Sequence, residues 1–145
     1  MRADLEVRRA RPDEIPACAE LYVRVLRDTF TWQPPERHHH KDFLHAAREE
    51  EVYVAVRDGE ILGLAAFYRP QHFLHSLYVA RRGEGIGKLL LDHVSAACGG
   101  TLSLKVQEPN VRAQAFYARE GFHCVERGQD IGSDVAWLRL VREKR

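Results

Sequence analysis

A basic, glycine-rich segment near the middle of the chain constrains the fold more than any other feature. Residues 81–88 read RRGEGIGK, with an apolar, strand-like run before them (73–79) and a helical run after them (89–97). Closely spaced glycines let a backbone turn tightly and aim successive N–H groups at one anion, while the following helix adds the positive end of its dipole. The pattern therefore predicts a strand–loop–helix unit that binds a pyrophosphate.

The spacing of the glycines disfavours two better-known phosphate loops. A Walker loop needs G-x-x-x-x-G-K-[ST], but Gly83 and Gly87 are one residue too close, and Leu89 replaces the hydroxyl that would hold magnesium. A dinucleotide-binding loop needs G-x-G-x-x-G after the first strand of a βαβ unit, whereas this chain has G-x-G-x-G halfway along. Neither a P-loop NTPase nor a Rossmann domain is expected.

Two motifs together carry a resemblance to a known family. Arg82, Gly85 and Gly87 supply the pattern R-x-x-G-x-G, and residues 110–122 supply N-x-x-A-x-x-F-Y-x-x-x-G-F. In this order and strand–helix context, they resemble the acetyl-CoA loop and the later motif of the GNAT superfamily of N-acetyltransferases. The resemblance implies acetyl-CoA as cosubstrate and no metal.

Hydrophobic periodicity predicts an α/β domain of the α+β type. Asp58-Gly59 is a strong hairpin signal between two β-rich runs. The expected helices cover about residues 11–28, 36–48, 89–98 and 110–120; the expected strands cover 5–9, 52–57, 61–69, 73–79, 102–106, 122–127 and 135–141. The resemblance implies the GNAT fold over residues 1–145 as a single domain. That fold has a mixed sheet of about seven strands, a V-shaped splay between the fourth and fifth strands, and about four flanking helices.

The bulk composition is that of a globular, cytoplasmic protein. With 145 residues and 45% hydrophobic content, the chain can bury a sizeable core without disulfide or metal support. Its net charge of +1 supplies no overall field for nucleic acid or a membrane surface. The start of the chain lacks the apolar core of a signal peptide. Cys18, Cys98 and Cys124 have no C-x-x-C spacing, so we expect reduced, buried thiols.

The resemblance implies which residues bind the cosubstrate. The backbone of residues 77–79 would pair with the two amides of pantetheine along the splayed strand edge. Amides of residues 83–88 would receive the pyrophosphate, with added positive charge from Arg81, Arg82 and Lys88. The implied acetyl-CoA-binding residues are Leu77, Tyr78, Val79, Arg82, Gly83, Glu84, Gly85, Ile86, Gly87, Lys88, Asn110, Phe116 and Tyr117.

Two residues of the later motif have alternative roles. Tyr117 lies where the family commonly places a general acid, and a phenol can protonate a leaving thiolate. The alternative is a core aromatic residue beside Phe116. Asn110 is expected to cap its helix and also to reach the cosubstrate, and capping alone is the alternative.

The base that would deprotonate the acceptor amine is the open part of the mechanism. Many family members use a glutamate on the strand before the glycine loop, and this strand has none. Residues 74–77 (LHSL) resemble the equivalent strand of serotonin N-acetyltransferase, where a histidine acts through water. His75, with an ordinary pKa near 6.5, is therefore the candidate base, and a satisfied polar residue is the alternative. Strand alternation predicts that His75 shares a face with Leu77 and Val79.

Candidate acceptor-binding residues lie in two loops. Phe30 and Trp32, between the first two helices, and residues 130–134 lie where the family builds its acceptor wall, and His75 would face the same space. The run His38-His39-His40 suggests a metal site. Consecutive histidines on a helix diverge, however, and few further ligands are nearby, so no metal is expected.

The sequence thus predicts an N-acetyltransferase that moves an acetyl group from acetyl-CoA to a primary amine by direct attack in a ternary complex. No cysteine lies in a motif position that would support an acetyl-enzyme. The alternative is a non-catalytic acyl-CoA-binding or regulatory module. Expected partners are a small-molecule or protein amine, with no nucleic acid and no membrane. A homodimer could form along the C-terminal sheet edge. The acceptor and the oligomeric state are left open.

Overall fold

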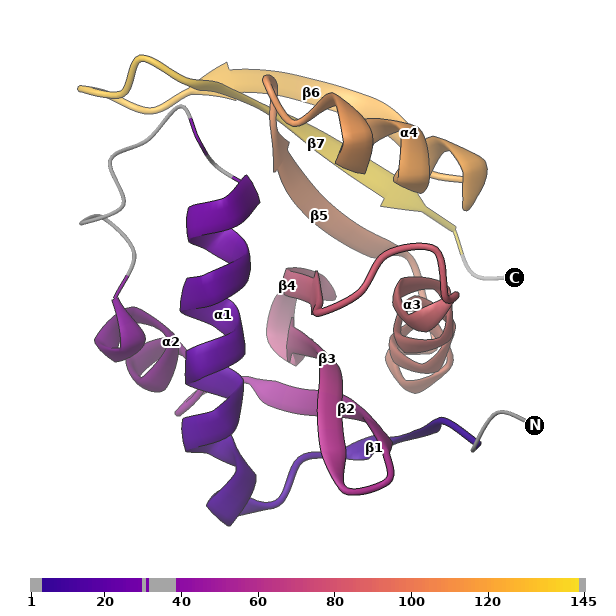
Figure 1. Cartoon of the computed structure of the whole chain (residues 1–145). Coiled ribbons are helices and arrows are strands. Elements are labelled where there is room, and N and C mark those ends of the chain that lie inside the picture. Colours follow the sequence, from indigo (N-terminus) through magenta and orange to yellow (C-terminus); the bar gives the residue numbers. More distant parts are fainter. Residues whose placement is uncertain (1–3, 30, 32–38, 144–145) are drawn as a thin grey trace.

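A mixed, seven-stranded sheet forms the centre of the computed structural model, which describes residues 4–29, 31 and 39–143 (Figure 1). The strand order is β1-β2-β3-β4-β5-β7-β6, and every neighbouring pair is antiparallel except β4 and β5. The strands are β1 (Glu6–Arg9), β2 (Glu51–Arg57), β3 (Glu60–Tyr68), β4 (Phe73–Val79), β5 (Leu102–Gln107), β6 (His123–Gln129) and β7 (Ala136–Arg142). This confirms the predicted fold class.

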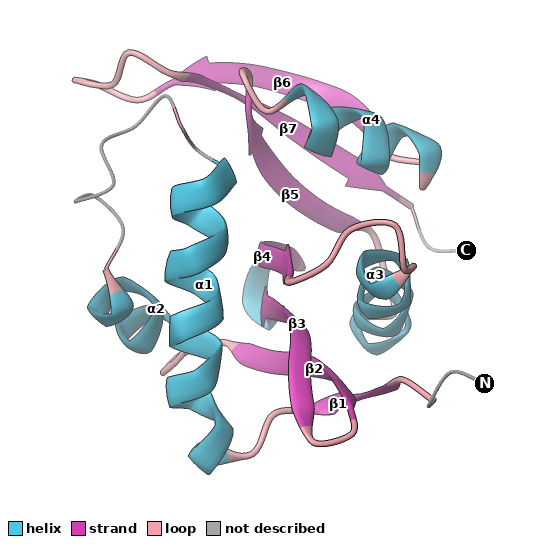
Figure 2. Cartoon of the chain, viewed as in Figure 1, coloured by secondary structure: helices cyan, strands magenta, loops and turns pink. Residues whose placement is uncertain are grey.

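Helices cover both faces of the sheet (Figure 2). They are α1 (Ile15–Thr29), α2 (His40–Ala46), α3 (Ile86–Cys98) and α4 (Val111–Arg119). One hydrophobic cluster, here the α3/α4 core, joins those two helices to β2–β5 and β7. The second cluster, the α1/α2 core, joins α1 and α2 to the other face of β2 and β3. The helix predicted at 36–48 begins at His40, because His39 is its extended N-cap (φ −123°, ψ 147°), and it ends at Ala46; residues 36–38 lie outside the described part of the chain.

The parallel strands β4 and β5 separate almost as soon as they meet. Only the pairs Phe73–Ser103 and Leu74–Leu104 join them, with one further hydrogen bond of 2.9 Å from the Ser103 N–H to the His72 carbonyl. The rest of this edge of β4 has no partner on β5. In Figure 1, β5, β7 and β6 accordingly arch away from β1–β4. The splay predicted between the fourth and fifth strands is confirmed.

A β-bulge interrupts β4 inside the splay. The register with β3 passes from the pair Ala66–Ser76 directly to Phe67–Leu74, so His75 has no cross-strand partner. Bulges bend a strand and re-aim side chains, and they are common beside active sites. The alternation used to place His75 from the sequence therefore fails at this residue.

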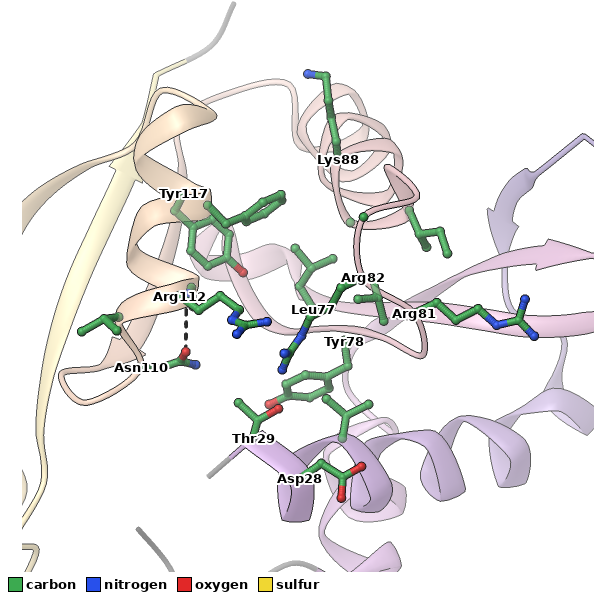
Figure 3. Close-up of a pocket in the computed structure, with 18 of the residues that line it drawn as sticks. Asp28, Thr29, Leu77, Tyr78, Arg81, Arg82, Lys88, Asn110, Arg112 and Tyr117 are labelled. Carbon is green, nitrogen blue, oxygen red and sulfur yellow. Dashed lines mark hydrogen bonds between the residues drawn. The ribbon is translucent and has the colours of Figure 1, made fainter. Parts of the chain in front are cut away.

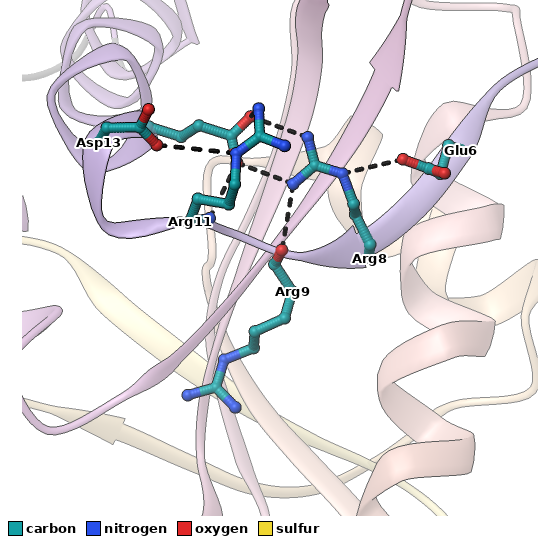
Figure 4. A network of polar contacts seen from close by, with 6 residues as sticks. Glu6, Arg8, Arg9, Arg11 and Asp13 are labelled. Atoms are coloured by element: carbon teal, nitrogen blue, oxygen red, sulfur yellow. Dashed lines mark hydrogen bonds and ion pairs between the residues drawn. The ribbon is translucent and has the colours of Figure 1, made fainter.

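An ion-pair network fixes the start of α1 (Figure 4). The guanidinium of Arg8 donates to both carboxylate oxygens of Glu14, at 2.8 and 2.9 Å, and to Glu6 at 2.8 Å. The Arg11 N–H also donates to Glu14, at 2.8 Å. The hydrogen bonds from Arg8, and then that from Arg11, lower the pKa of Glu14 to about 2. The network holds α1 against β1.

The thiol prediction is correct for two cysteines and wrong for the third. Cys18 and Cys98 are buried, and burial raises the pKa of Cys18 to about 11. Cys124 is exposed because β6 is an edge strand whose side chains are mostly in solvent. Across the described part of the chain, no helix is both long and apolar enough to cross a bilayer.

Candidate functional site

A cavity of about 810 Å³, here the first cavity, opens where β4 and β5 separate (Figure 3). This volume is typical of small-molecule sites. Glu84 alone of the predicted cosubstrate-binding residues is not part of the lining, because its carboxylate pairs with Arg57 at 2.9 Å. The predicted residues that line the cavity are Leu77, Tyr78, Val79, Arg82, Gly83, Gly85, Ile86, Gly87, Lys88, Asn110, Phe116 and Tyr117.

The glycine loop has the backbone geometry that its sequence predicts. Gly83 and Gly85 have φ angles of 78° and 76°, in the left-handed region that is unfavourable for residues with a side chain. Gly85 is the N-cap of α3, and no side chain of the described residues caps this helix end. A Cβ at Gly87 would lie 3.4 Å from the Phe116 ring, so the loop packs closely on α4. Gly85, Ile86 and Gly87 line the first cavity, so the uncapped N-terminus of α3 faces it.

The cations around the first cavity differ in whether an acid already holds them. Lys88 Nζ lies 3.0 Å from Glu120 and 3.3 Å from Asp92, which raise the pKa of the lysine, and Figure 3 shows it pointing away from the cavity. Arg82 and Arg112 line the cavity, and within the described ranges no acidic side chain pairs with either. Arg119 also lines the cavity and has no acidic partner among the described residues, so the free positive charge comes from three arginines.

Sequence reasoning missed Arg112. It lies in the first turn of α4, two residues after the capping Asn110, and it extends into the first cavity beside Arg82 (Figure 3). Its position between two motif residues was the available signal, but the motif itself leaves that position unspecified.

Tyr117 is a core aromatic residue, and its role as general acid stays a prediction. Its ring packs edge-on against Phe116 and Phe122, with centroids 5.1 and 5.3 Å apart, and the residue is only 8% exposed. Its hydroxyl points into the cavity (Figure 3). Burial raises the pKa of Tyr117, which keeps the phenol protonated as a proton donor must be.

Asn110 caps α4, as predicted. Its Oδ1 accepts a hydrogen bond of 3.2 Å from the Ala113 N–H. The residue also lines the first cavity, so its side-chain NH₂ group is left to contact a ligand. The capping role is therefore present, and the second role stays a prediction.

A second cavity, of about 630 Å³, adjoins the first at Tyr117. Its wall is formed by α1, β4, β5, α4, the 130–135 loop and β7, and it includes His75. Both cavities share the lining residues Leu77, Tyr78, Asn110, Ala113 and Tyr117. A ligand in the first cavity and a ligand in the second would therefore meet beside the hydroxyl of Tyr117.

Trp137 forms part of the wall of the second cavity, and sequence reasoning missed it. Its Nε1 donates to Asp130 at 3.2 Å, and Lys105 Nζ lies 4.1 Å from the centroid of the ring. A Cβ at Gly128 would lie 2.2 Å from the indole, so only glycine leaves room for this ring position. A glycine inside a strand was the available signal, since it marks close approach of another group.

His75 contacts a buried carboxylate that the sequence did not suggest. Its Nδ1 lies 3.2 and 3.1 Å from the two oxygens of Glu50, the residue before β2. The Glu50 side chain is 6% exposed, whereas that of His75 is 50% exposed. The hydrogen bond to Glu50 raises the pKa of His75, and burial opposes this only in part.

The predicted face of His75 is wrong. Leu77 and Val79 pack on the α3/α4 core. Glu50 directly precedes β2 and lies two residues before Val52, so it faces the same side of the sheet as Val52, which belongs to the α1/α2 core. His75 contacts Glu50 and therefore lies on that side. The bulge shifts the alternation by one residue, and this places His75 on the α1/α2 side.

Part of the predicted acceptor site falls outside the described residues. Phe30, Trp32 and His38 lie outside the part of the chain that the structure describes. His39 is the N-cap of α2, and His40 lies 3.9 Å from Glu20. Among the residues that the structure describes, no three His, Cys, Asp or Glu side chains come together as a metal site.

Comparison with known proteins agrees with this geometry. Residues 15–122 match the model of the acetyltransferase (GNAT) family. The chain is 30% identical over 129 residues to the peptidyl-lysine N-acetyltransferase YiaC of Escherichia coli (strain K12), covering 83% of this chain and 84% of that protein. It is 33% identical over 90 residues to the 5-NmdU N-acetyltransferase of Pseudomonas phage PaMx11, covering 57% of this chain and 63% of the phage protein.

A solved GCN5-related N-acetyltransferase from Rhodopseudomonas palustris has the same fold, with a TM-score of 0.81 over 99% of this chain and 98% of that one, at 18% identity. The family model spans most of the chain, including the glycine loop and the Asn110 motif. Since the matched relatives are also N-acetyltransferases by name, this chain is an acyltransferase that belongs to the GNAT family of acetyltransferases.

Proposed function

We propose that this acetyltransferase moves an acetyl group from acetyl-CoA to a primary amine by direct attack in a ternary complex. The observation that carries the proposal is the junction of the two cavities at Tyr117. One cavity has the phosphate loop and the unpaired edge of β4, and the other offers a separate entry for an acceptor. A donor and an acceptor can then be bound together, which direct attack requires.

Acetyl-CoA would bind along the first cavity. The unpaired edge of β4 suits the pantetheine amides, which can add to a sheet edge as a strand does. The amides of the glycine loop and the N-terminus of α3 suit the pyrophosphate, and Arg82 and Arg112 supply positive charge. The thioester would then lie beside Tyr117.

Acetyl transfer from an ammonium acceptor needs two protons removed from the nitrogen and one supplied to the sulfur. His75 takes a proton from the ammonium group of the acceptor, directly or through water, and the neutral nitrogen attacks the thioester carbonyl. As the carbon–sulfur bond breaks, the nitrogen loses its second proton to solvent, and the Tyr117 hydroxyl gives its proton to the thiolate. Solvent then reprotonates the phenolate and takes the proton from His75.

The second cavity would bind the acceptor. Its lining combines apolar side chains with Trp137, Lys105 and Asp130. The named relatives act on peptidyl-lysine and on 5-NmdU, so we infer a primary amine on a small molecule or a protein as acceptor. The non-catalytic alternative is not favoured, because these relatives are N-acetyltransferases by name.

A free-thiol assay with acetyl-CoA and a panel of amines tests the proposal. The panel includes lysine peptides, free amino acids, polyamines and aminomethyl nucleosides. At least one class should release thiol, and Tyr117→Phe should lower kcat by about 10²-fold without changing CoA affinity. Tyr68→Phe, on β3 outside both cavities, is the matched control and should behave as wild type. Absence of amine-dependent thiol release across the panel would contradict the proposal.

A further inference from the structure

The side chain of Glu50 is buried although it carries a carboxylate. Among the described residues, His75 is the only side chain that makes a hydrogen bond or ion pair with it. Burying a carboxylate is costly unless another group compensates its charge, so the contact with His75 is not incidental. The half-exposed imidazole connects this buried charge to the second cavity.

The geometry also selects one tautomer of His75. Both Glu50 oxygens approach Nδ1, and an ionised carboxylate only accepts hydrogen bonds, so the proton of the neutral imidazole is on Nδ1. Nε2 then carries the lone pair. A histidine base oriented in this way by a carboxylate is a recurring arrangement in proton-transfer sites.

We propose that Glu50 is a positioning residue for acetyl transfer, holding the Nδ1–H of His75 so that Nε2 accepts the proton of the acceptor amine in the second cavity. This inference rests on the proposed function. When Nε2 takes a proton, the resulting imidazolium is stabilised by the adjacent carboxylate, and the proton later leaves from Nε2 to solvent.

Among the described residues, other charged and titratable groups lie around Glu50 and the second cavity. Tyr22 lies on α1, Asp42 on α2 and Tyr78 on β4, while Lys105 and Asp130 line the far side of the second cavity. Glu50 makes the direct contact with the imidazole, and it raises the pKa of His75. A higher pKa of His75 lies closer to the pKa of an alkylammonium acceptor, which makes the proton transfer less unfavourable.

Histidine side-chain ¹⁵N NMR of the full chain tests the contact independently of activity. We expect neutral His75 to carry its proton on Nδ1, with a pKa above 6.5 that falls in Glu50→Gln. Glu49→Gln, at the exposed neighbouring position, is the matched control and should change neither property. An Nε2–H tautomer in the wild type, or an unchanged pKa of His75 in Glu50→Gln, overturns the inference.

Kinetics test the role in the reaction. In Glu50→Gln, the acidic limb of the kcat/KM profile should move to lower pH and the plateau should fall about tenfold, with KM for acetyl-CoA unchanged. Glu50→Asp should restore part of the rate, since it keeps the charge. In a His75→Ala background, Glu50→Gln should have no further effect, because the two residues act as a unit.

The possible failures are distinguishable. If His75→Ala keeps the wild-type rate and pH profile while Tyr117→Phe lowers kcat, acetyl transfer stands and the role of Glu50 is refuted. If no amine releases thiol, the proposed function fails and the role of Glu50 falls with it. The NMR measurement then reports whether the Glu50–His75 contact exists.

Discussion

The unpaired arginines of the first cavity differ from its lysine in what already surrounds them. Arg82 and Arg112 have no acidic partner in the described parts of the chain, whereas Lys88 is held by Glu120 and Asp92. An anion entering the cavity gains most from the cations that no acid neutralises. The sequence gives all three the same charge, and only the structure separates them.

This difference predicts an asymmetric mutational effect on CoA affinity. Arg82→Gln and Arg112→Gln should each weaken CoA binding by about tenfold, the cost of one charge-assisted hydrogen bond. Lys88→Gln is the matched control and should change affinity by less than about threefold. Calorimetric titration of CoA into each variant measures this. A larger loss in the lysine variant than in either arginine variant would contradict the assignment.

A second residue-scale prediction concerns the acceptor. Gly128→Ala should push the Trp137 ring out of position, because the added Cβ would lie 2.2 Å from it. We expect KM for the acceptor amine to rise about tenfold, an effect of the size of one lost aromatic contact, while CoA affinity stays within twofold of wild type. Steady-state kinetics with both substrates varied measures the two effects. An unchanged acceptor KM would remove Trp137 from the acceptor site.

At the scale of elements, α3 is positioned by a close contact with β3. A Cβ at Gly63 would lie 2.9 Å from Ile86 and Leu90 and 3.2 Å from the Tyr78 carbonyl. Ile86 begins α3 directly after the glycine loop. The absence of a side chain at Gly63 therefore sets how closely the phosphate loop approaches the sheet.

Gly63→Val should be destabilising and should also weaken CoA binding. Overpacking of this kind costs about 1–3 kcal/mol, because α3 must move outward from the sheet. Urea unfolding followed by circular dichroism gives the free energy of unfolding, and the CoA titration gives the affinity. Gly63→Ala should show a smaller loss of both. Wild-type values in Gly63→Val would mean that α3 moves without cost.

Helices and strands were predictable because periodicity and turn residues are local signals. The Asp58-Gly59 turn, the run at 73–79 and the glycine loop each specify their structure within a few residues. The bulge at His75 was not predictable, since it depends on the register of β4 against β3. Glu50 was missed for the same reason, because it lies 25 residues before His75 in the chain.

At the scale of the whole molecule, we expect acid to destabilise the fold by protonating carboxylates that pair with arginines in the folded protein. Glu14 has a pKa of about 2 in the folded protein against an ordinary 4.5, and Arg69 and Arg127 lower the pKa values of Glu51 and Glu108. A lowered folded-state pKa contributes stability above the ordinary value. That stability is lost as pH falls toward the folded-state value.

We therefore expect the melting temperature of the wild type to fall steeply between about pH 4.5 and 2. Glu14→Gln should start from a lower melting temperature at pH 7 and show a shallower fall over the same range. Asp13→Asn is the matched control, because the Asp13 side chain is 81% exposed. Differential scanning calorimetry at stepped pH makes the comparison. Parallel curves for wild type and Glu14→Gln would refute a stabilising role for Glu14.

The short seam between β4 and β5 makes the sheet a structure in two halves joined by a few hydrogen bonds. A cosubstrate that pairs with the open edge of β4 would serve as a temporary strand and carry part of the mechanical connection itself. Loading the donor would then protect the free amides of β4 from solvent, and release of free CoA would expose them again. Amide exchange along β4 should report this cycle, slow when the donor is bound and fast when the site is empty.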